Sequence, residues 1–228
     1  MHDVRKIDVM ESIHDENDHI AAHVRDYLTE KDIFSINVMG APGIGKTTVI
    51  KHIIAELRER KPYVIEGDIE SDIDARALRA IGVKTFQINT FGACHLDAPL
   101  VHNAIGNMEF DEKGVLFIEN IGNLVCPAEF RIGEHALMLI CSVTEGSDKP
   151  YKYPLAFERA DLILLNKVDL TPHLDFDESF FMKGLRALNK EAPVIKLSCK
   201  TGEGFAAAAA WIETRAAAPA KRGTEPPL

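Results

Sequence analysis

The stretch GAPGIGKT, residues 40–47, has the composition of a phosphate-binding loop, because it satisfies the pattern G-x-x-x-x-G-K-[S/T]. Glycines let backbone amides curl round a phosphate, and the start of a following helix adds a favourable field. In such a loop Lys46 contacts the β- and γ-phosphates of a nucleotide, and the hydroxyl of Thr47 binds Mg²⁺. The predicted phosphate-binding residues are Gly40, Ala41, Pro42, Gly43, Ile44, Gly45, Lys46, Thr47 and Thr48.

Two later stretches predict that the base is guanine. LILLNKVDL ends an apolar run with the carboxylate of Asp169, which can accept hydrogen bonds from both N–H donors on the Watson–Crick edge of guanine. Adenine offers a ring-nitrogen acceptor there and lacks the second donor. The N-K-x-D pattern resembles the guanine-specificity element of GTPases, and KLSCKTGEG resembles their S-A-K loop with cysteine in place of alanine. The predicted base-binding residues are Asn166, Lys167, Asp169, Ser198, Cys199 and Lys200.

A carboxylate for Mg²⁺ is expected at the end of the strand beside the phosphate-loop strand. GVLFIENIGN supplies Glu119 there, in the form E-N-x-G where GTPases usually have D-x-x-G. The longer side chain leaves both direct and water-mediated contact with Mg²⁺ open. We expect the amide of Gly122 to sense the γ-phosphate, in a segment that orders with GTP and relaxes with GDP.

The stretch EGDIESDIDA adds two acidic candidates, Asp68 and Asp72, for the Mg²⁺ shell or for orienting the attacking water. Asp72 fits equally well as a carboxylate stabilised by a helix N-terminus. The predicted reaction is attack of water on the γ-phosphate, and its unaided turnover should be slow because no residue stands out as a strong base. The predicted catalytic residues are Lys46, Thr47, Asp68, Glu119 and Gly122, with Mg²⁺ bound among Thr47, Asp68, Asp72 and Glu119.

Three residues could form a second, softer metal site. Cys94 and His95 are adjacent after the run TFQINT, and Cys126 follows four residues after Gly122. Loops after parallel strands meet at one edge of a sheet, so these three side chains could converge. Thiolate and imidazole suit Zn²⁺ and Ni²⁺. Spacing alone leaves this open, because there is no C-x-x-C pair and a free cysteine is often a small buried hydrophobe.

The elements that must position these residues alternate along the chain. Near-continuous apolar runs joined by helical segments predict an α/β P-loop NTPase fold, a doubly wound, mostly parallel sheet with helices on both faces. The predicted strands are 34–39, 63–68, 85–90, 114–120, 136–143, 162–167 and 193–198, and the clearest helices are 46–60, 177–190 and 205–215.

Three regions follow from this pattern. Residues 1–32 form an N-terminal helical segment with an apolar stripe and a break near 15–17. Residues 33–215 form the G domain. Residues 216–228 are Pro-rich and polar, which predicts a disordered tail.

Composition limits the partners. The formal net charge of −9 argues against non-specific nucleic-acid binding, which needs a basic surface, although a local site can still bind a small anion. No apolar run approaches the roughly 18 residues needed to span a bilayer. The polar, acidic N-terminus is unlike a signal peptide, so we expect four cysteine thiols in a reducing cytoplasm.

The whole set of motifs resembles the hydrogenase maturation GTPase family HypB, which assists nickel insertion into [NiFe]-hydrogenase. The resemblance covers about residues 34–204, and GACHLDA and ENIGNLVCP are its most specific parts. It implies that Cys94, His95 and Cys126 bind Ni²⁺ or Zn²⁺, coupled to a homodimer that depends on GTP or GDP. It also implies a nickel-carrying accessory protein and the hydrogenase large subunit as partners. The other motifs are GAPGIGKTT, IEGDIESDIDA, SVTEGSDKPYKYP, LLNKVDL and LSCKTGEG.

The resulting hypothesis is a GTP-hydrolysing metallochaperone in which GTP moves Cys126 relative to Cys94 and His95. Two alternatives stay open. A urease-type nickel GTPase carries its metal on Cys-Pro-His, whereas here Ala128 follows Cys126-Pro127. A GTP-gated recruitment scaffold would use its cysteines for no metal. The chain has no histidine-rich storage stretch, and the i, i+4 pair His19 and His23 is expected on a solvated helix face.

Overall fold

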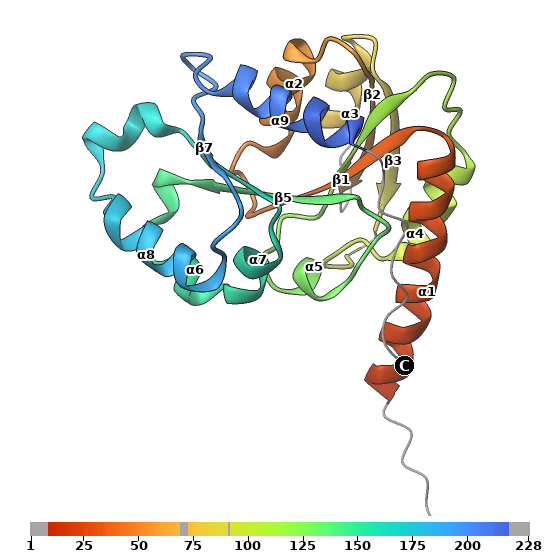
Figure 1. The fold of residues 1–228 in the computed structure, drawn as a ribbon, viewed down its shortest axis with the longest axis horizontal. Coiled ribbons are helices and arrows are strands. Elements are labelled where there is room, and N and C mark those ends of the chain that lie inside the picture. Colours follow the sequence, from red (N-terminus) through yellow and green to blue (C-terminus); the bar gives the residue numbers. More distant parts are fainter. Residues whose placement is uncertain (1–8, 69–72, 91, 219–228) are drawn as a thin grey trace, which may run out of the picture.

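The computed structural model describes residues 9–68, 73–90 and 92–218 (Figure 1). Asp72 and most of the predicted tail, residues 219–228, lie outside this part of the chain. Within it, no helix combines the length and the apolar character that a membrane crossing requires.

A seven-stranded sheet, parallel throughout, forms the centre of the molecule, with strand order β3-β2-β4-β1-β5-β6-β7. Each predicted apolar run is a strand, which confirms the predicted fold class. The strands are β1 (Ile33–Gly40), β2 (Lys61–Asp68), β3 (Lys84–Asn89), β4 (Gly114–Glu119), β5 (Ala136–Ser142), β6 (Leu162–Asn166) and β7 (Val194–Lys196).

Burial on both faces explains why the central strands are apolar along their whole length. Every residue of β4, β5 and β6 is buried, whereas the edge strands β3 and β7 are largely half-buried or exposed. The α-helices are α1 (Val9–Glu30), α2 (Lys46–Glu56), α3 (Ile73–Arg79), α4 (Ala98–Gly106), α5 (Cys126–Glu129), α6 (Lys149–Lys152), α7 (Pro154–Arg159), α8 (Glu178–Leu188) and α9 (Phe205–Ala217).

The helices cover both faces of the sheet (Figure 1). One face packs against α2, α3 and α9 through a continuous apolar cluster that includes Ile50, Leu78 and Ile212. The other face packs against α1 and α4 near β2 and β4, and against α7 and α8 near β5 and β6. Helices therefore cover both faces of the sheet, and a binding site can form only at its edges.

The N-terminal helix α1 runs unbroken from Val9 to Glu30, so the predicted break near 15–17 is wrong. Asp15 and Glu16 are exposed, while Asn17 points inward and is 4% exposed. The polar cluster thus reflects two faces of one helix rather than an interruption. Further along, Val24 and Leu28 are fully buried in the cluster against β1, β2 and β4.

All seven strands run in the same direction, so the loops that follow them lie at one edge of the sheet. The phosphate loop follows β1, the Cys94-His95 loop follows β3, and the segment 120–126 follows β4. This is the edge where open α/β sheets bind ligands.

Candidate nucleotide and metal site

The phosphate loop connects β1 to α2, as its motif requires. Gly43 (φ 68°) and Gly45 (φ 96°) both lie in the left-handed region, where a side chain would be strained. Lys46 and Thr47 are the first two residues of α2, so the loop amides and the helix N-terminus face the same place. The local structure has the form of a phosphate-binding nest.

Thr47 and Glu119 meet beside this loop. The Thr47 hydroxyl donates a hydrogen bond of 2.9 Å to Glu119 Oε1, and both residues are buried. Their contact follows from the sheet, because β4 pairs directly with β1 and Glu119 lies opposite Val38. A hydroxyl and a carboxylate are hard oxygen donors, so this pair fits Mg²⁺.

The segment after β4 packs against the phosphate loop. A Cβ on Gly122 would lie 2.9 Å from Pro42 Cα, so only glycine permits this approach. The next residue, Asn123, forms an isolated antiparallel bridge with Gly40. The segment after β4 is therefore in direct contact with the phosphate loop.

Asn166, one of the predicted base-binding residues, is tied to the phosphate loop. Asn166 is 1% exposed, and its side-chain amide donates to Ile44 O at 3.1 Å. Its side-chain oxygen accepts from the amide of Lys167, which has φ 60°. Asp169 Oδ1 accepts a hydrogen bond of 2.7 Å from Ser198 Oγ, which orients the carboxylate predicted to bind guanine. Asn166 is thus placed to brace the loop.

Three further predicted site residues are Cys199, Lys200 and Asp68. The thiol of Cys199 is half-buried, and burial raises its pKa, which favours the neutral form. Lys200 is exposed in the adjoining turn. Asp68 ends β2, with its backbone opposite Asn89 on β3. Asp68 therefore stands two strands away from the phosphate-loop strand.

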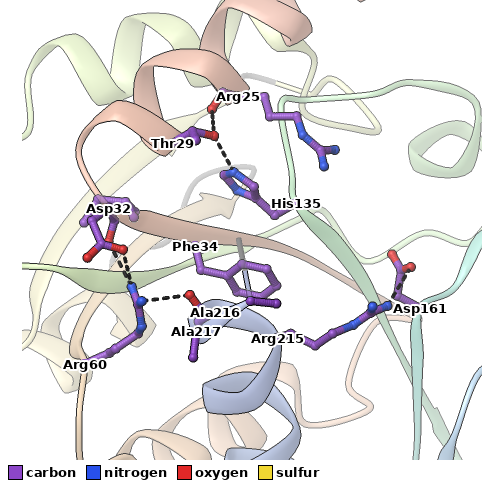
Figure 2. Close-up of a pocket in the computed structure, with 12 residues that line it drawn as sticks. Arg25, Thr29, Asp32, Phe34, Arg60, His135, Asp161, Arg215, Ala216 and Ala217 are labelled. Carbon is purple, nitrogen blue, oxygen red and sulfur yellow. Dashed lines mark hydrogen bonds and ion pairs between the residues drawn. The ribbon is translucent and has the colours of Figure 1, made fainter. Parts of the chain in front are cut away.

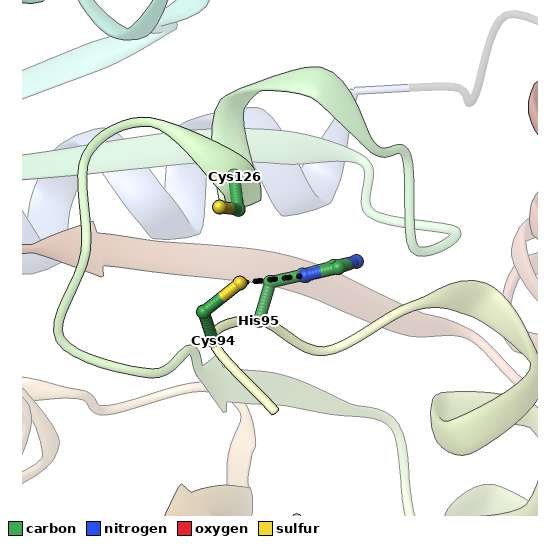
Figure 3. A group of neighbouring side chains, drawn as sticks. All are labelled: Cys94, His95 and Cys126. Carbon is green, nitrogen blue, oxygen red and sulfur yellow. Dashed lines mark hydrogen bonds between the residues drawn. The ribbon is translucent and has the colours of Figure 1, made fainter. Parts of the chain in front are cut away.

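Cys94, His95 and Cys126 converge, although β2 separates the strands that precede their loops. Their ligand atoms all lie within 4.8 Å of one another, and Figure 3 shows the two thiols and the imidazole around one space. Cys94 Sγ lies 3.5 Å from His95 Nδ1. Two sulfurs and one imidazole nitrogen fit Zn²⁺ or Ni²⁺, and the exposure of Cys94 leaves room for a further ligand.

The surroundings of Cys94 and His95 shift their pKa values in opposite directions. The pKa of Cys94 is raised, chiefly by its hydrogen bond with the Cys126 thiol. The pKa of His95 is lowered, chiefly by burial, with the nearby carboxylates of Asp97 and Glu129 opposing that shift. The lowered pKa favours the neutral form of His95, which is the form that binds metals, and Cys94 must release a proton when it binds one.

Two asparagines that were not predicted from the sequence join the loop of Cys94 and His95 to the segment after β4. Asn120 Oδ1 accepts from the amide of Leu96 at 3.0 Å, and Asn120 Nδ2 donates to Asn37 Oδ1 on β1 at 3.2 Å. Asn123 Nδ2 donates to the carbonyl of Cys94 at 3.4 Å. The available signal was the polar pattern N-x-x-N directly after a buried strand.

The histidine pair on α1, His19 and His23, does not form a cluster like that of Cys94, His95 and Cys126. His19 and His23 are exposed and line a groove of about 780 Å³ with His102. In the described part of the chain, Cys94, His95 and Cys126 form the only group of three His, Cys, Asp or Glu side chains whose ligand atoms all lie within 4.8 Å of one another.

A hollow of about 610 Å³ lies at the opposite edge of the sheet, where β1 begins (Figure 2). Its arginines are engaged by protein groups: Arg60 pairs with Asp32 at 2.9 Å and Arg215 pairs with Asp161 at 3.6 Å. It contains none of the predicted site residues.

Comparisons with known proteins give a consistent result. The family model described as "CobW/HypB/UreG, nucleotide-binding domain" matches residues 34–196. Hydrogenase maturation factor HypB of Azotobacter vinelandii is 47% identical over 210 residues, which are 92% of this chain and 69% of that protein. A probable HypB of Methanocaldococcus jannaschii is 38% identical, over 93% of this chain and 97% of that protein.

Two solved structures share the fold closely. The crystal structure of HypB from Helicobacter pylori in complex with nickel matches with a TM-score of 0.85 and 32% identity, covering 88% of this chain and 95% of that one. HypB from Archaeoglobus fulgidus matches with a TM-score of 0.82 and 35% identity, covering 88% and 98%.

Proposed function

Because this chain belongs to the HypB group of the CobW/HypB/UreG family, we propose that it is a GTP-hydrolysing metallochaperone that delivers nickel during [NiFe]-hydrogenase maturation. The observation that carries this proposal is the direct bonding between two loops. The segment after β4, which packs on the phosphate loop, is also bonded to the loop of Cys94 and His95 through Asn120 and Asn123. A change at the nucleotide thus has a short path to the cysteines.

The proposed reaction is attack of water on the γ-phosphate of GTP. The loop amides and Lys46 stabilise charge on the phosphate oxygens, and Asp169 selects guanine. Thr47 and Glu119 would hold Mg²⁺, which supplies charge neutralisation across the β- and γ-phosphates. No strong base is evident among the residues that the structure describes, so we expect slow hydrolysis that a partner accelerates.

The proposed switch is mechanical, with Ni²⁺ as cargo. A γ-phosphate near the Gly122 amide would draw the segment after β4 toward the phosphate loop, and Cys126 ends that segment. Cys126 would then shift relative to Cys94 and His95. Nucleotide can drive delivery only if the free energy of metal binding differs between the GDP and GTP states.

The proposed partners complete the site. Because Cys94 is exposed, a metal ion bound to it can accept a further ligand from a second copy of the chain, from a nickel-carrying accessory protein or from the hydrogenase large subunit. We propose a homodimer whose formation depends on GTP or GDP. A cytoplasmic location is consistent with four free thiols, because thiols persist in a reducing compartment.

The deciding experiment is a chelator-competition titration with Ni²⁺ and, in parallel, Zn²⁺, on protein loaded with GDP or a non-hydrolysable GTP analogue. The variants are Cys94→Ala and, as a matched thiol control, Cys141→Ala, whose side chain is buried in β5. We expect the wild type and Cys141→Ala to bind metal with nucleotide-dependent affinity and Cys94→Ala to lose binding.

Weak, identical binding in every sample would overturn the metal role. The recruitment scaffold would then be the better explanation, because its GTP state needs no metal. A urease-type site is disfavoured, because Ala128 stands where that motif has its histidine.

A further inference from the structure

A single buried side chain on α1 bonds to both loops that carry the proposed metal ligands, the loop after β3 with Cys94 and His95 and the segment that includes Cys126. Asn17 Oδ1 accepts from the amide of Ala98 at 2.9 Å, three residues after His95. Asn17 Nδ2 donates to the carbonyl of Arg131 at 2.8 Å, just after the helix that Cys126 begins. The two ends of one carboxamide thus join loops that lie 33 residues apart in the sequence, from position 98 to position 131.

An aromatic stack adds a second connection between α1 and the same loops. The ring of Phe130 stacks on His95, with centroids 4.3 Å apart, and on His14 of α1, with centroids 4.7 Å apart. Phe130 follows the short helix α5, which begins with Cys126. The imidazole that serves the metal site is therefore oriented by a ring whose neighbour belongs to α1.

Each loop is consequently held from two sides. On the nucleotide side, Asn120 and Asn123 bind the backbone of residues 94–96. On the far side, Asn17 binds Ala98 and Arg131. α1 itself is anchored by Val24 and Leu28, which are fully buried against the sheet. One attachment is linked to the phosphate loop, and the other is fixed to the core.

We propose that α1 is the fixed brace of the metal site, with Asn17 as its positioning residue. The brace holds both loops at Ala98 and Arg131, while nucleotide displaces them on the side of Asn120 and Asn123. This displacement changes the geometry among the three proposed ligands, Cys94, His95 and Cys126. Without the brace, both loops would follow the displacement together, and the change in that geometry would be lost. This inference rests on the metal role proposed above.

The physical basis is preorganisation. Ligands that are held in place before the metal arrives bind it more tightly, and residues outside the ligand set that orient the ligands contribute about 10- to 100-fold in affinity. Replacing Asn17 by alanine leaves the Ala98 amide and the Arg131 carbonyl without their partner and frees both loops.

The test compares Asn17→Ala with Ile212→Ala, in which α9, on the opposite face of the sheet from α1, loses a buried contact. Ni²⁺ affinity is measured by chelator competition in the GDP and GTP-analogue states, and the thermal midpoint is measured on metal-free protein. The sulfur-to-nickel charge-transfer band reports how many thiolates bind. Phe130→Leu, which removes the stack and keeps an apolar side chain, serves as a second variant.

We expect Asn17→Ala to weaken Ni²⁺ binding by about tenfold, to reduce the charge-transfer band and to narrow the difference between nucleotide states. Ile212→Ala should lower the thermal midpoint at least as much and leave Ni²⁺ affinity within about twofold. Phe130→Leu should weaken Ni²⁺ binding in the same direction as Asn17→Ala, and it carries the test if Asn17→Ala does not fold.

Equal weakening of Ni²⁺ binding in Asn17→Ala and Ile212→Ala would overturn the brace, because general loosening of the fold would then explain the effect. Wild-type affinity in Asn17→Ala, or in Phe130→Leu where that variant carries the test, would also overturn it. Wild-type affinity in Cys94→Ala would instead remove the proposed metal role on which the brace depends.

Discussion

The side-chain amide of Asn123 donates a hydrogen bond of 3.4 Å to the backbone carbonyl of Cys94, while the backbone of Asn123 bridges to Gly40 at the start of the phosphate loop. One residue thus contacts both the predicted phosphate loop and the loop that carries two of the proposed metal ligands, Cys94 and His95. This relationship gives the proposed coupling a specific, removable link.

Asn123→Ala removes the bond to Cys94 and the bond that Asn123 Oδ1 accepts from the Val125 amide, and it retains the backbone bridge to Gly40. We expect the ratio of Ni²⁺ affinities between the GDP and GTP-analogue states to shrink toward one, while GTP affinity stays within about twofold, because both lost bonds lie outside the phosphate loop. The exposed Asn107, which bonds only to nearby Asn103 through its side chain, gives a control in Asn107→Ala. An unchanged ratio in Asn123→Ala would exclude this link.

Glu119→Gln keeps the size of the side chain and removes the charge that accepts the bond from Thr47. We expect the rate constant of single-turnover GTP hydrolysis to fall by at least about tenfold. The dependence of nucleotide affinity on Mg²⁺ should also weaken, since an amide is a poorer Mg²⁺ ligand than a carboxylate. Glu119→Asp restores the usual D-x-x-G form and should retain more activity. Full activity in Glu119→Gln at low Mg²⁺ would assign the metal to another residue.

Asp169→Asn exchanges an acceptor-only carboxylate for an amide that both donates and accepts. Guanine nucleotide affinity should fall by at least about tenfold, because a donor then faces the base donors, and affinity for xanthosine nucleotides should rise, because xanthine has a carbonyl at that edge. Equilibrium titration with labelled nucleotides checks this expectation. Asp175→Asn, in an exposed position, controls for the loss of one charge. An unaltered preference for guanine in Asp169→Asn would mean that other residues recognise the base.

His135 should make the stability of the fold depend on pH. Its Nδ1 accepts from the Ser35 amide at 3.0 Å, so the neutral ring carries its proton on Nε2, which lies 2.9 Å from the Thr29 hydroxyl (Figure 2). Burial, and secondarily the charge of Arg25, lowers the pKa of His135 to about 4. The unfolded chain, with a pKa near 6.5, binds the proton first as pH falls.

The free energy of unfolding therefore has its full His135 contribution above about pH 6.5 and loses it progressively toward pH 4, by at most about 3 kcal/mol. Denaturant unfolding of the wild type and His135→Gln between pH 5 and 7 checks this. The free energy of unfolding should rise more steeply with pH in the wild type than in the variant. Equal slopes would mean that groups other than His135 cause the pH dependence.

Local patterns were sufficient for much of the fold. The phosphate loop is one continuous stretch whose chemistry depends on residues 40–47 alone, and the parallel strands are recognisable because burial on both faces requires unbroken apolar runs. The pairing of Thr47 with Glu119 was expected from the same rules, because the metal-binding carboxylate belongs on the neighbouring strand. Periodicity failed at residues 15–17, where it cannot tell an inward-facing polar side chain from a break.

The sequence by itself determined the class of fold, the nucleotide and the residues with metal-binding chemistry, because each is encoded in contiguous residues or in a simple repeat. Only the tertiary structure decided how these parts are joined. Asn166 reaches Ile44 across 122 positions, and Asn17 reaches Ala98 and Arg131 across 81 and 114. Such bonds depend on which loops the strand order β3-β2-β4-β1 brings together, and no local pattern of residues carries that information.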